Sequence, residues 1–429
     1  MERYERYKDS GVKWIGEIPE HWEVRKMKYV FQERSQKGFP KLPLLAATQQ
    51  YGVIKKDDYE NRTVVATKGL ETLKLVCKND FVISLRSFEG GIEMSHEKGI
   101  ISPAYTILTP QNIEPSYFRH LGKSPVFINL LKIMVTGIRE GQNIDYNKLK
   151  TDFIPLPPKS EQTAIANYLD SVTSKIDEAI SQQQKMIDLL NERKQIIIQN
   201  AVTKGLDPNA KMKDSGVEWI GEIPEDWEVK KLKHVCQAFG RIGFRGYSTT
   251  DLVDEREGCI TLSPSNMRDG QMQYEKCTYL SWEKYEESPE IKIHNGDILF
   301  VKTGSTYGKS SLVEDLPLEA TINPQLLVFK NFTCNNKFLV YVLQTTTIKT
   351  QVEVSVIGGT IPTISQQKIL NYVFPYPTVN VQDDIVAFIE NKTTPICEAI
   401  KVSERQIALL QERKQIIIND VVTGKVKVV

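Results

Sequence analysis

Residues 8–30 read KDSGVKWIGEIPEHWEVRKMKYV, and residues 213–235 read KDSGVEWIGEIPEDWEVKKLKHV, with 18 of these 23 positions identical. A second pair, NERKQIII at 191–198 and QERKQIII at 411–418, follows at an offset of 220 residues instead of 205. Repetition at a long period predicts two copies of one structural unit. The interiors between the matched ends, 32–154 and 237–374, share almost no sequence. The two copies therefore share their end segments, here called the frame, and differ in their interiors.

The composition is that of an ordinary globular protein, with 40% hydrophobic and 25% charged residues among 429. The formal net charge is only +1, so any nucleic-acid surface must be local. We expect no membrane-spanning segment and no signal peptide, because apolar runs are short and the first residues are charged. The six cysteines form no CxxC pair, which favours reduced cysteines in the cytoplasm.

Each interior predicts a mixed α/β fold in which strands dominate. The runs 80–85 and 297–301 are short and apolar, and each begins with an aspartate. A polar loop with glycines follows each run, at 86–91 in the first copy and at 302–309 in the second. Both halves therefore contain the same strand–loop–strand order, with different side chains in the loop.

Each copy ends in a segment that predicts a long helix. Residues 160–204 contain no glycine or proline, and apolar side chains recur in steps of four and three from Ile165 through Met186 to Leu190. This seam is typical of a helix that packs lengthwise on another helix. The second copy repeats the seam from Ile385 to Leu410, although Pro395 predicts a break near residue 394. We expect the two helices to form an antiparallel coiled coil; the alternative is that each packs only on its own unit.

Catalytic motifs are missing from the sequence. The stretch GSTYGKS at 304–310 resembles a phosphate-binding loop but has three residues, not four, between its glycines. Histidines and cysteines have no metal-ligand spacing, and no nucleophile elbow is present. This pattern favours a binding module. Two alternatives stay open: an NTPase or nuclease that uses loop 302–310, and a coiled-coil adaptor that does not touch DNA.

Cations, aromatic side chains and hydroxyls gather in the interior loops. Arginine pairs with guanine edges, and lysine, serine and threonine hold phosphates. The competing interpretation is that these loops are ordinary solvated turns. The candidate DNA contacts are Arg86, Ser87, Arg139, Arg241, Arg245, Tyr247, Lys302, Thr303, Ser305, Tyr307 and Lys309.

Three motifs together carry a family resemblance that covers the whole chain. They are the WIGEIPExWEV block that opens each half, PLPPxxEQxxIA at 155–166, and the ERKQIII helix ends. The chain resembles the specificity subunit of type I restriction–modification enzymes. The resemblance implies two pseudo-twofold-related target-recognition domains, 1–158 and 207–378, separated by two long conserved spacer helices, 159–206 and 379–429.

The resemblance also implies a function. Each recognition domain would read one half of an asymmetric bipartite site in double-stranded DNA, and the helices would set the gap. Two methylase subunits would dock on the helices and bring S-adenosylmethionine for adenine N6 methylation, and restriction subunits would join for cleavage. The chain itself would be non-catalytic, would bind no cofactor or metal, and would work in the prokaryotic cytoplasm.

The residues expected to contact the partners lie on the two helices, and one departs from the repeat. Val381 stands in the second copy where the first has Glu161, which predicts either a weaker second docking surface or contact elsewhere on that helix. The candidate partner contacts are Glu161, Gln162, Ile165, Leu169, Glu192, Arg193, Gln382, Ile385, Glu412 and Arg413.

Overall fold

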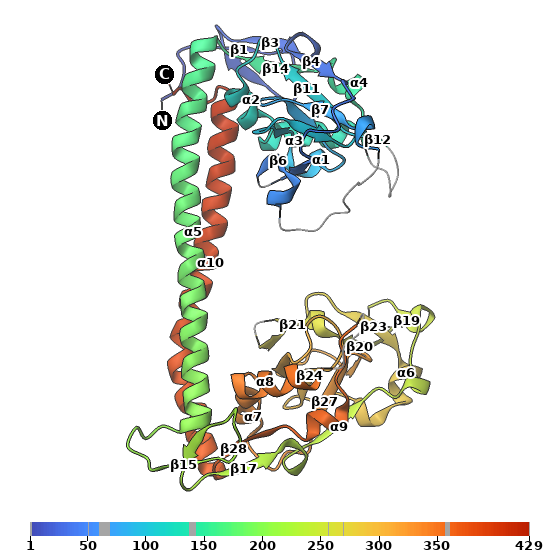
Figure 1. Cartoon of the computed structure of the whole chain (residues 1–429), viewed down its shortest axis with the longest axis vertical. Coiled ribbons are helices and arrows are strands. Elements are labelled where there is room, and N and C mark those ends of the chain that lie inside the picture. Colours follow the sequence, from blue (N-terminus) through green and yellow to red (C-terminus); the bar gives the residue numbers. More distant parts are fainter. Residues whose placement is uncertain are drawn as a thin grey trace. The chain divides into compact units, whose positions relative to one another are not determined.

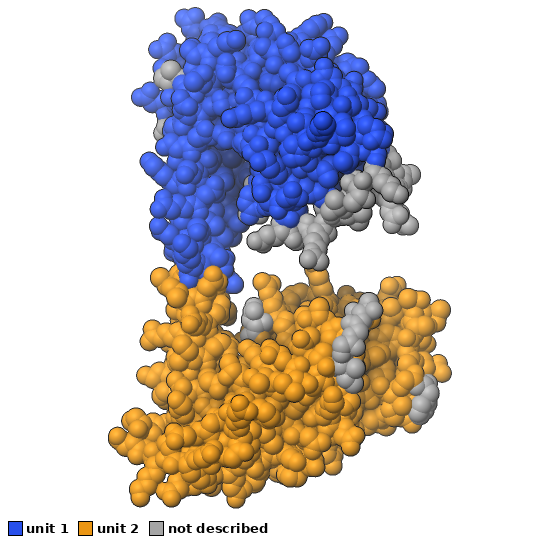
Figure 2. Space-filling model, viewed as in Figure 1, with its two compact units in different colours: residues 1–185, 403–429 blue, residues 186–402 orange. Residues whose placement is uncertain are grey.

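The computed structural model describes residues 2–49, 51–59, 69–136, 143–255, 257–268, 270–356 and 361–428. They form two compact units (Figure 2). Unit 1 comprises residues 1–185 and 403–429, and unit 2 comprises residues 186–402. The sequence boundaries treated the long helices as segments of their own, whereas the division between the units passes through both helices.

Unit 1 combines small antiparallel sheets with short helices (Figure 1). Its strands are β1 (Tyr7–Asp9), β2 (Glu17–Pro19), β3 (Glu23–Lys26), β4 (Phe31–Arg34), β5 (Leu45–Thr48), β6 (Gly52–Lys55), β7 (Lys74–Val76), β8 (Phe81–Ile83), β9 (Glu93–Met94), β10 (Gly99–Ile101), β11 (Thr106–Pro110), β12 (Val135–Thr136), β13 (Asn143–Ile144) and β14 (Phe153–Leu156). Its short helices are α1 (Ser87–Gly90), α2 (Pro115–Leu121), α3 (Pro125–Ile133) and α4 (Tyr146–Leu149). The central sheet has the order β4-β11-β8-β9.

Unit 2 repeats this plan and adds a second four-stranded sheet. Its strands are β15 (Met212–Asp214), β16 (Glu222–Pro224), β17 (Glu228–Lys231), β18 (Gln237–Gly240), β19 (Leu252–Val253), β20 (Gly258–Leu262), β21 (Met267–Arg268), β22 (Gln271–Met272), β23 (Thr278–Ser281), β24 (Ile298–Val301), β25 (Ser310–Leu312), β26 (Ala320–Ile322), β27 (Leu326–Lys330) and β28 (Val373–Tyr376). Its short helices are α6 (Trp282–Glu286), α7 (Asn336–Leu343), α8 (Thr346–Ser355) and α9 (Gln366–Leu370). The central sheet β18-β27-β24-β25 matches that of unit 1, and β19-β23-β20-β26 is the additional one.

The repeated sequence blocks form the shared frame. In each copy the block makes a hairpin, β1 with β2 or β15 with β16, and then a strand that pairs with the last strand of the interior, β3 with β14 or β17 with β28. Trp22 and Trp227 from the two blocks are buried in the cores of their units. The mixed helix-and-strand fold with a repeated domain, expected from the sequence, is confirmed.

The two long helices, α5 (Lys159–Lys204) and α10 (Val379–Val422), pack on each other, as the seam predicted. In unit 1 the first part of α5 lies beside the last part of α10, with Lys414 Nζ 2.7 Å from Asp177 Oδ1 (Figure 1). Ile165 of α5 and Val421 of α10 belong to one core cluster there. In unit 2 the end of α5 and the start of α10 share a core. The helices are therefore antiparallel, and each helix contributes to both units.

The buried face of α5 departs from the predicted seam near its middle. Met186 is 51% exposed, and its neighbour Ile187 is buried instead. Ile176, Ile187 and Ile198 are buried at intervals of eleven residues. An eleven-residue interval corresponds to about 3.67 residues per turn, so the stripe drifts away from a strict heptad. The expectation that Met186 lies in the seam is wrong for this reason.

Helix α10 continues through Pro395, and the predicted break near residue 394 is absent from this described helix. Proline removes one backbone donor from the helical ladder. Hydroxyls just before it add bonds to the preceding turn: Thr393 Oγ1 donates to the carbonyl of Ile389 at 2.7 Å, and Thr394 Oγ1 to that of Glu390 at 2.6 Å. Packing of Ile385, Val386 and Ile389, which precede Pro395, in the unit 2 core stabilises the turns before it.

A glutamine near the start of each long helix bonds that helix to the unit in which the helix begins. Gln162 accepts a bond from the backbone N–H of Glu114, just before α2, and donates to the carbonyl of Pro157, both at 2.8 Å. Gln382 makes the same two bonds in unit 2, to the N–H of Asn335 and the carbonyl of Pro377, both at 2.9 Å. Both side chains are buried, so no water replaces them if they are lost.

We expect Gln162→Leu to destabilise unit 1 by about 2 kcal/mol, because it leaves a partly buried N–H and a buried carbonyl without their partner. Gln382→Leu should do the same in unit 2. Hydrogen exchange followed by mass spectrometry should show lost protection over α2 for the first variant and over α7 for the second. Gln411→Leu, at an exposed position of α10, is the matched control. Unchanged protection in both variants would contradict the fastening role.

Candidate nucleic-acid and partner interfaces

In unit 1 the loop after β8 holds an exposed cation on a rigid base. Ser87 is buried and its hydroxyl accepts a bond from the backbone N–H of Ser84 at 2.9 Å. Arg86 between them is exposed, and its guanidinium has no hydrogen-bond or ion-pair partner among the described residues. Ser87 therefore holds the loop and also lines the cavity beside it, and its contact with DNA stays a prediction. Arg86 stays a candidate.

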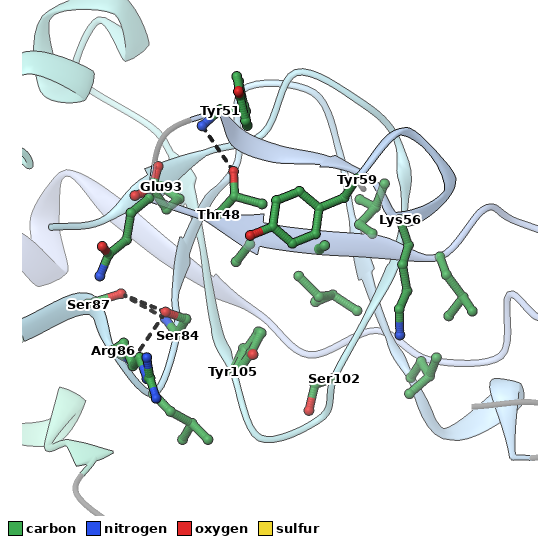
Figure 3. A pocket seen from close by; sticks show the side chains of 18 of the residues that line it. Thr48, Tyr51, Lys56, Tyr59, Ser84, Arg86, Ser87, Glu93, Ser102 and Tyr105 are labelled. Carbon is green, nitrogen blue, oxygen red and sulfur yellow. Dashed lines mark hydrogen bonds between the residues drawn. The ribbon is translucent and has the colours of Figure 1, made fainter. Parts of the chain in front are cut away.

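A cavity of about 920 Å³ opens beside this loop (Figure 3). The hairpin β5–β6, the loop after β8 and the loop before β11 supply its walls. The lining combines aromatic rings, hydroxyls and cations with one carboxylate, a mixture that suits a planar, polar ligand. Prominent members are Thr48, Tyr51, Lys56, Tyr59, Ser84, Arg86, Glu93, Ser102 and Tyr105.

Glu93 is the unusual member of this lining. Its carboxylate lies on β9, is only 2% exposed, and has Lys123 Nζ at 2.7 Å from Oε2. Neither carboxylate oxygen has a hydrogen-bond partner of good geometry among the described residues. Burial raises the pKa of Glu93 to about 7, and the nearby Lys123 ammonium opposes that rise. A buried, incompletely paired carboxylate costs stability and points to a function.

In unit 2 the corresponding loop follows β24 and begins with Lys302. Burial lowers the pKa of this half-buried ammonium, which has no acidic partner among the described residues. Thr303 bridges to Thr363 through the backbone, and Tyr307 packs against the unit 2 core. Lys309 donates to the carbonyl of Met267 at 3.1 Å. Ser305, Thr306 and Lys309 are the exposed side chains of this loop, and Lys302 is a half-buried cation without an acidic partner among the described residues.

The loop does not have the local structure of a phosphate-binding loop. Such a loop leads into a helix, whose N-terminus faces the phosphates. Residues 304–309 lead instead into strand β25. This observation argues against the NTPase alternative.

The cations at 241–247 are used inside unit 2. Arg241 is 6% exposed, and its guanidinium donates to the carbonyls of Ile322 and Arg245 and to the hydroxyl of Thr321. It also lies over the ring of Tyr247. Arg245 pairs with Glu290 at 3.3 Å. Arg241 is therefore bonded within unit 2, and its contact with DNA stays a prediction. Arg139 lies outside the described residues.

Six of the predicted partner contacts are buried within the chain's own units: Glu161, Gln162, Ile165, Leu169, Gln382 and Ile385. Glu161 accepts bonds from the hydroxyl of Tyr4 and from His21 Nε2, the latter at 2.8 Å. These six side chains attach the helices to the chain's own units, and direct partner contact by them stays a prediction. Sequence alone could not distinguish a shared internal role from a shared external one.

A family model described as the type I restriction modification DNA specificity domain matches residues 19–187 and again residues 224–407. The chain belongs to this family. Each match covers one interior and the first part of one long helix, so the structural repeat and the family repeat coincide.

Individual relatives agree with the family model. The type I restriction enzyme MjaVIII specificity subunit of Methanocaldococcus jannaschii is 25% identical, over 98% of this chain and 97% of the relative. The putative MjaX specificity subunit of the same organism is 24% identical, over 98% of both chains. A solved chain from a study of complex assembly and conformational transition of the type I R-M system has a TM-score of 0.66 at 16% identity, covering 95% and 99% of the two chains. That likeness shows a shared fold.

The other four predicted partner contacts of this specificity subunit are exposed. They lie beside exposed apolar side chains, here called the apolar stripe, that were not predicted from the sequence: Leu189, Ile196, Leu409 and Ile416. Glu192 and Arg193 lie between Leu189 and Ile196 on α5, which are 61% and 52% exposed. Glu412 and Arg413 lie between Leu409 and Ile416 on α10, which are 55% and 52% exposed. The two pairs are related by the 220-residue offset, and this recurrence outside the buried seam was the signal that could have identified them.

Two further observations concern the described residues alone. They contain no group of three or more histidine, cysteine or acidic side chains placed to hold a metal ion. None of the helices within them has the length and apolarity required to cross a lipid bilayer.

Proposed function

We propose that this specificity subunit reads an asymmetric, bipartite site in double-stranded DNA, with one half-site recognised by each unit. The observation that carries the proposal is that two interiors with almost no common sequence sit in one repeated frame. Both place a cation without an acidic partner among the described residues in the loop after the third strand of the central sheet: the exposed Arg86 in unit 1 and the half-buried Lys302 in unit 2. Two copies of one enzyme would keep the same catalytic residues in both units. Two domains that recognise different DNA sequences would differ in the loops that contact the DNA.

The catalytic steps then belong to partner subunits. Two methylase subunits bring S-adenosylmethionine and methylate adenine at N6, and restriction subunits join the complex for cleavage. The specificity subunit itself holds no cofactor in this proposal and works in the cytoplasm, where the cell's DNA is. A structural adaptor without DNA contact is the remaining alternative, and the test below separates it.

Exchange of Arg86 for alanine should weaken recognition of one half-site only. The methylase and this chain are co-expressed, and sequencing of host DNA for N6-methyladenine gives the bipartite motif. Purified complex is then titrated with duplexes that carry one half-site and a scrambled partner. Arg86→Ala should lower the affinity for the first half-site roughly tenfold, and Lys302→Ala should lower it for the second.

Lys401→Ala, which removes an exposed cation from α10, is the control and should change neither affinity. Equal losses on both half-sites in each variant would contradict two separate readers. Absence of any sequence-dependent methylation or binding by the wild-type complex would favour the adaptor.

Docking of the methylase subunits is assigned to the exposed apolar stripe. Leu409 and Ile416 belong to unit 1, and Leu189 and Ile196 to unit 2. Apolar side chains left exposed at heptad spacing along a helix suit a partner helix. Because the same pair recurs in each unit, the chain offers two like surfaces, in keeping with two copies of one partner.

A charge in the stripe should remove one methylase subunit from the complex. Leu409→Glu and Leu189→Glu should each reduce the methylase count from two to one by native mass spectrometry, because a buried carboxylate without a partner is costly. Ala408→Glu places the same charge on an adjacent exposed position and should leave two. Retention of both subunits in the two leucine variants would place docking elsewhere.

A further inference from the structure

Unit 2 extends a connection that is short in unit 1. Hairpin β21–β22 lies between strands β20 and β23, whereas the corresponding strands of unit 1, β5 and β6, are joined by residues 49–51. The connections correspond because β20 pairs in parallel with β26, and Leu44 beside β5 bridges in parallel to Ile100 of β10. Hairpin β21–β22 is therefore an extension of the tip of a strand pair that both units share.

Both tips lie beside the loop that follows the third strand of the central sheet. In unit 1, Gln49 and Tyr51 line the same cavity as Arg86 (Figure 3). In unit 2, Lys309 Nζ of the loop donates to the backbone carbonyl of Met267 at 3.1 Å. Tip and loop therefore adjoin in each unit, and the side chains at the tips differ. Such a difference is expected where two domains recognise different DNA sequences.

The pleat of hairpin β21–β22 places two polar side chains outward. Met267 and Met272 lie opposite each other across the hairpin; Met267 is buried in a core cluster, and Met272 packs against that cluster. Arg268 and Gln271 form the next cross-strand pair. Because successive side chains of a strand point to opposite faces, this second pair lies on the face turned away from the core. Both side chains are exposed.

A buried asparagine holds the base of the hairpin. Asn266 is 3% exposed, and its side-chain N–H groups donate to the carbonyls of Gln273 and Lys276, both at 3.2 Å. Its side-chain oxygen accepts a bond from the backbone N–H of Ser263 at 3.0 Å. The outward pair is therefore presented on a fixed backbone, which lowers the entropy lost when a ligand binds.

The chemistry of the outward pair matches base edges. The major groove of B-DNA admits a two-stranded β-ribbon. Arginine donates two hydrogen bonds to O6 and N7 of guanine, and a glutamine amide donates to N7 and accepts from N6 of adenine. Side chains that are opposed across two antiparallel strands are about 5 Å apart, and successive base pairs are about 3.4 Å apart. The two side chains can therefore reach base pairs one or two steps apart.

We propose that hairpin β21–β22 enters the major groove of the second half-site, where Arg268 contacts a guanine and Gln271 contacts an adenine one or two base pairs away. This inference rests on the proposed function, because it requires that unit 2 reads DNA. It adds base contacts from the hairpin to the contact proposed for Lys302 in the neighbouring loop.

The test uses the complex with its methylase subunits and duplexes of the mapped motif. In these duplexes 7-deazaguanine or 7-deazaadenine replaces the purines of the second half-site one at a time. Each analogue removes the N7 acceptor from the major groove and keeps Watson–Crick pairing. The wild-type complex should bind roughly tenfold more weakly when the contacted guanine or the contacted adenine is replaced. Arg268→Ala should lose sensitivity to that guanine analogue alone, and Gln271→Ala to that adenine analogue alone.

Mapping of N6-methyladenine in host DNA gives a second, independent readout. Arg268→Ala should relax the motif at the guanine and Gln271→Ala at the adenine, with the first half-site unchanged. An intact first half-site also shows that each variant folds and assembles. Lys233→Ala removes an exposed cation that precedes β18, at the other end of the unit 2 central sheet from Lys302. This control should change neither the motif nor the sensitivity to the analogues.

The outcomes separate the role of the hairpin from the proposed function. If Arg268→Ala weakens binding equally on every sequence and keeps its sensitivity to the guanine analogue, its contact is with phosphate and the inference is overturned. Variants that keep the wild-type motif and the wild-type sensitivities also overturn it, and DNA reading by unit 2 stands. If the wild-type complex shows no sequence preference, the proposed function fails and the inference fails with it.

Discussion

The structure depends on the way each globular core is completed by the ends of two different helices. In unit 1 the core around Trp22 contains Ile165 from the start of α5 and Val421 from the end of α10. The core of unit 2 contains Val202 from the end of α5 and Ile385 from the start of α10. Neither recognition domain can bury its apolar surface without both helices. The frame is therefore a requirement of folding, and the loops it carries are free to change.

This arrangement explains why the repeated residues repeat. Gln162 and Gln382 make the same pair of backbone bonds, and Trp22 and Trp227 fill the same kind of core position. These residues maintain the geometry of the frame. The loop side chains of Arg86 and Lys302 do not hold the frame together, since neither has a polar partner among the described residues.

Much of the frame could be predicted from the sequence, and much of the site could not. The repeats and the apolar seam predicted two units and an antiparallel helix pair, because hydrophobic periodicity is a local property of the chain. The burial of Arg241 and Glu161 could not be predicted, because a charged residue in a promising motif gives no sign that the fold buries it among its own partners. Met186 was wrongly placed in the buried seam, because the buried stripe of α5 does not keep a heptad spacing there.

The most direct test of the central claim, that one paired-helix frame joins two independent readers, is a change in the length of the frame. One heptad is deleted from both α5 and α10, in register, and N6-methyladenine is mapped in the DNA of cells that co-express the methylase. Seven residues of helix span about 10 Å, which is about three base pairs. The account predicts both half-sites unchanged, with the gap between them shortened by about three base pairs. The original motif with its original gap would contradict it.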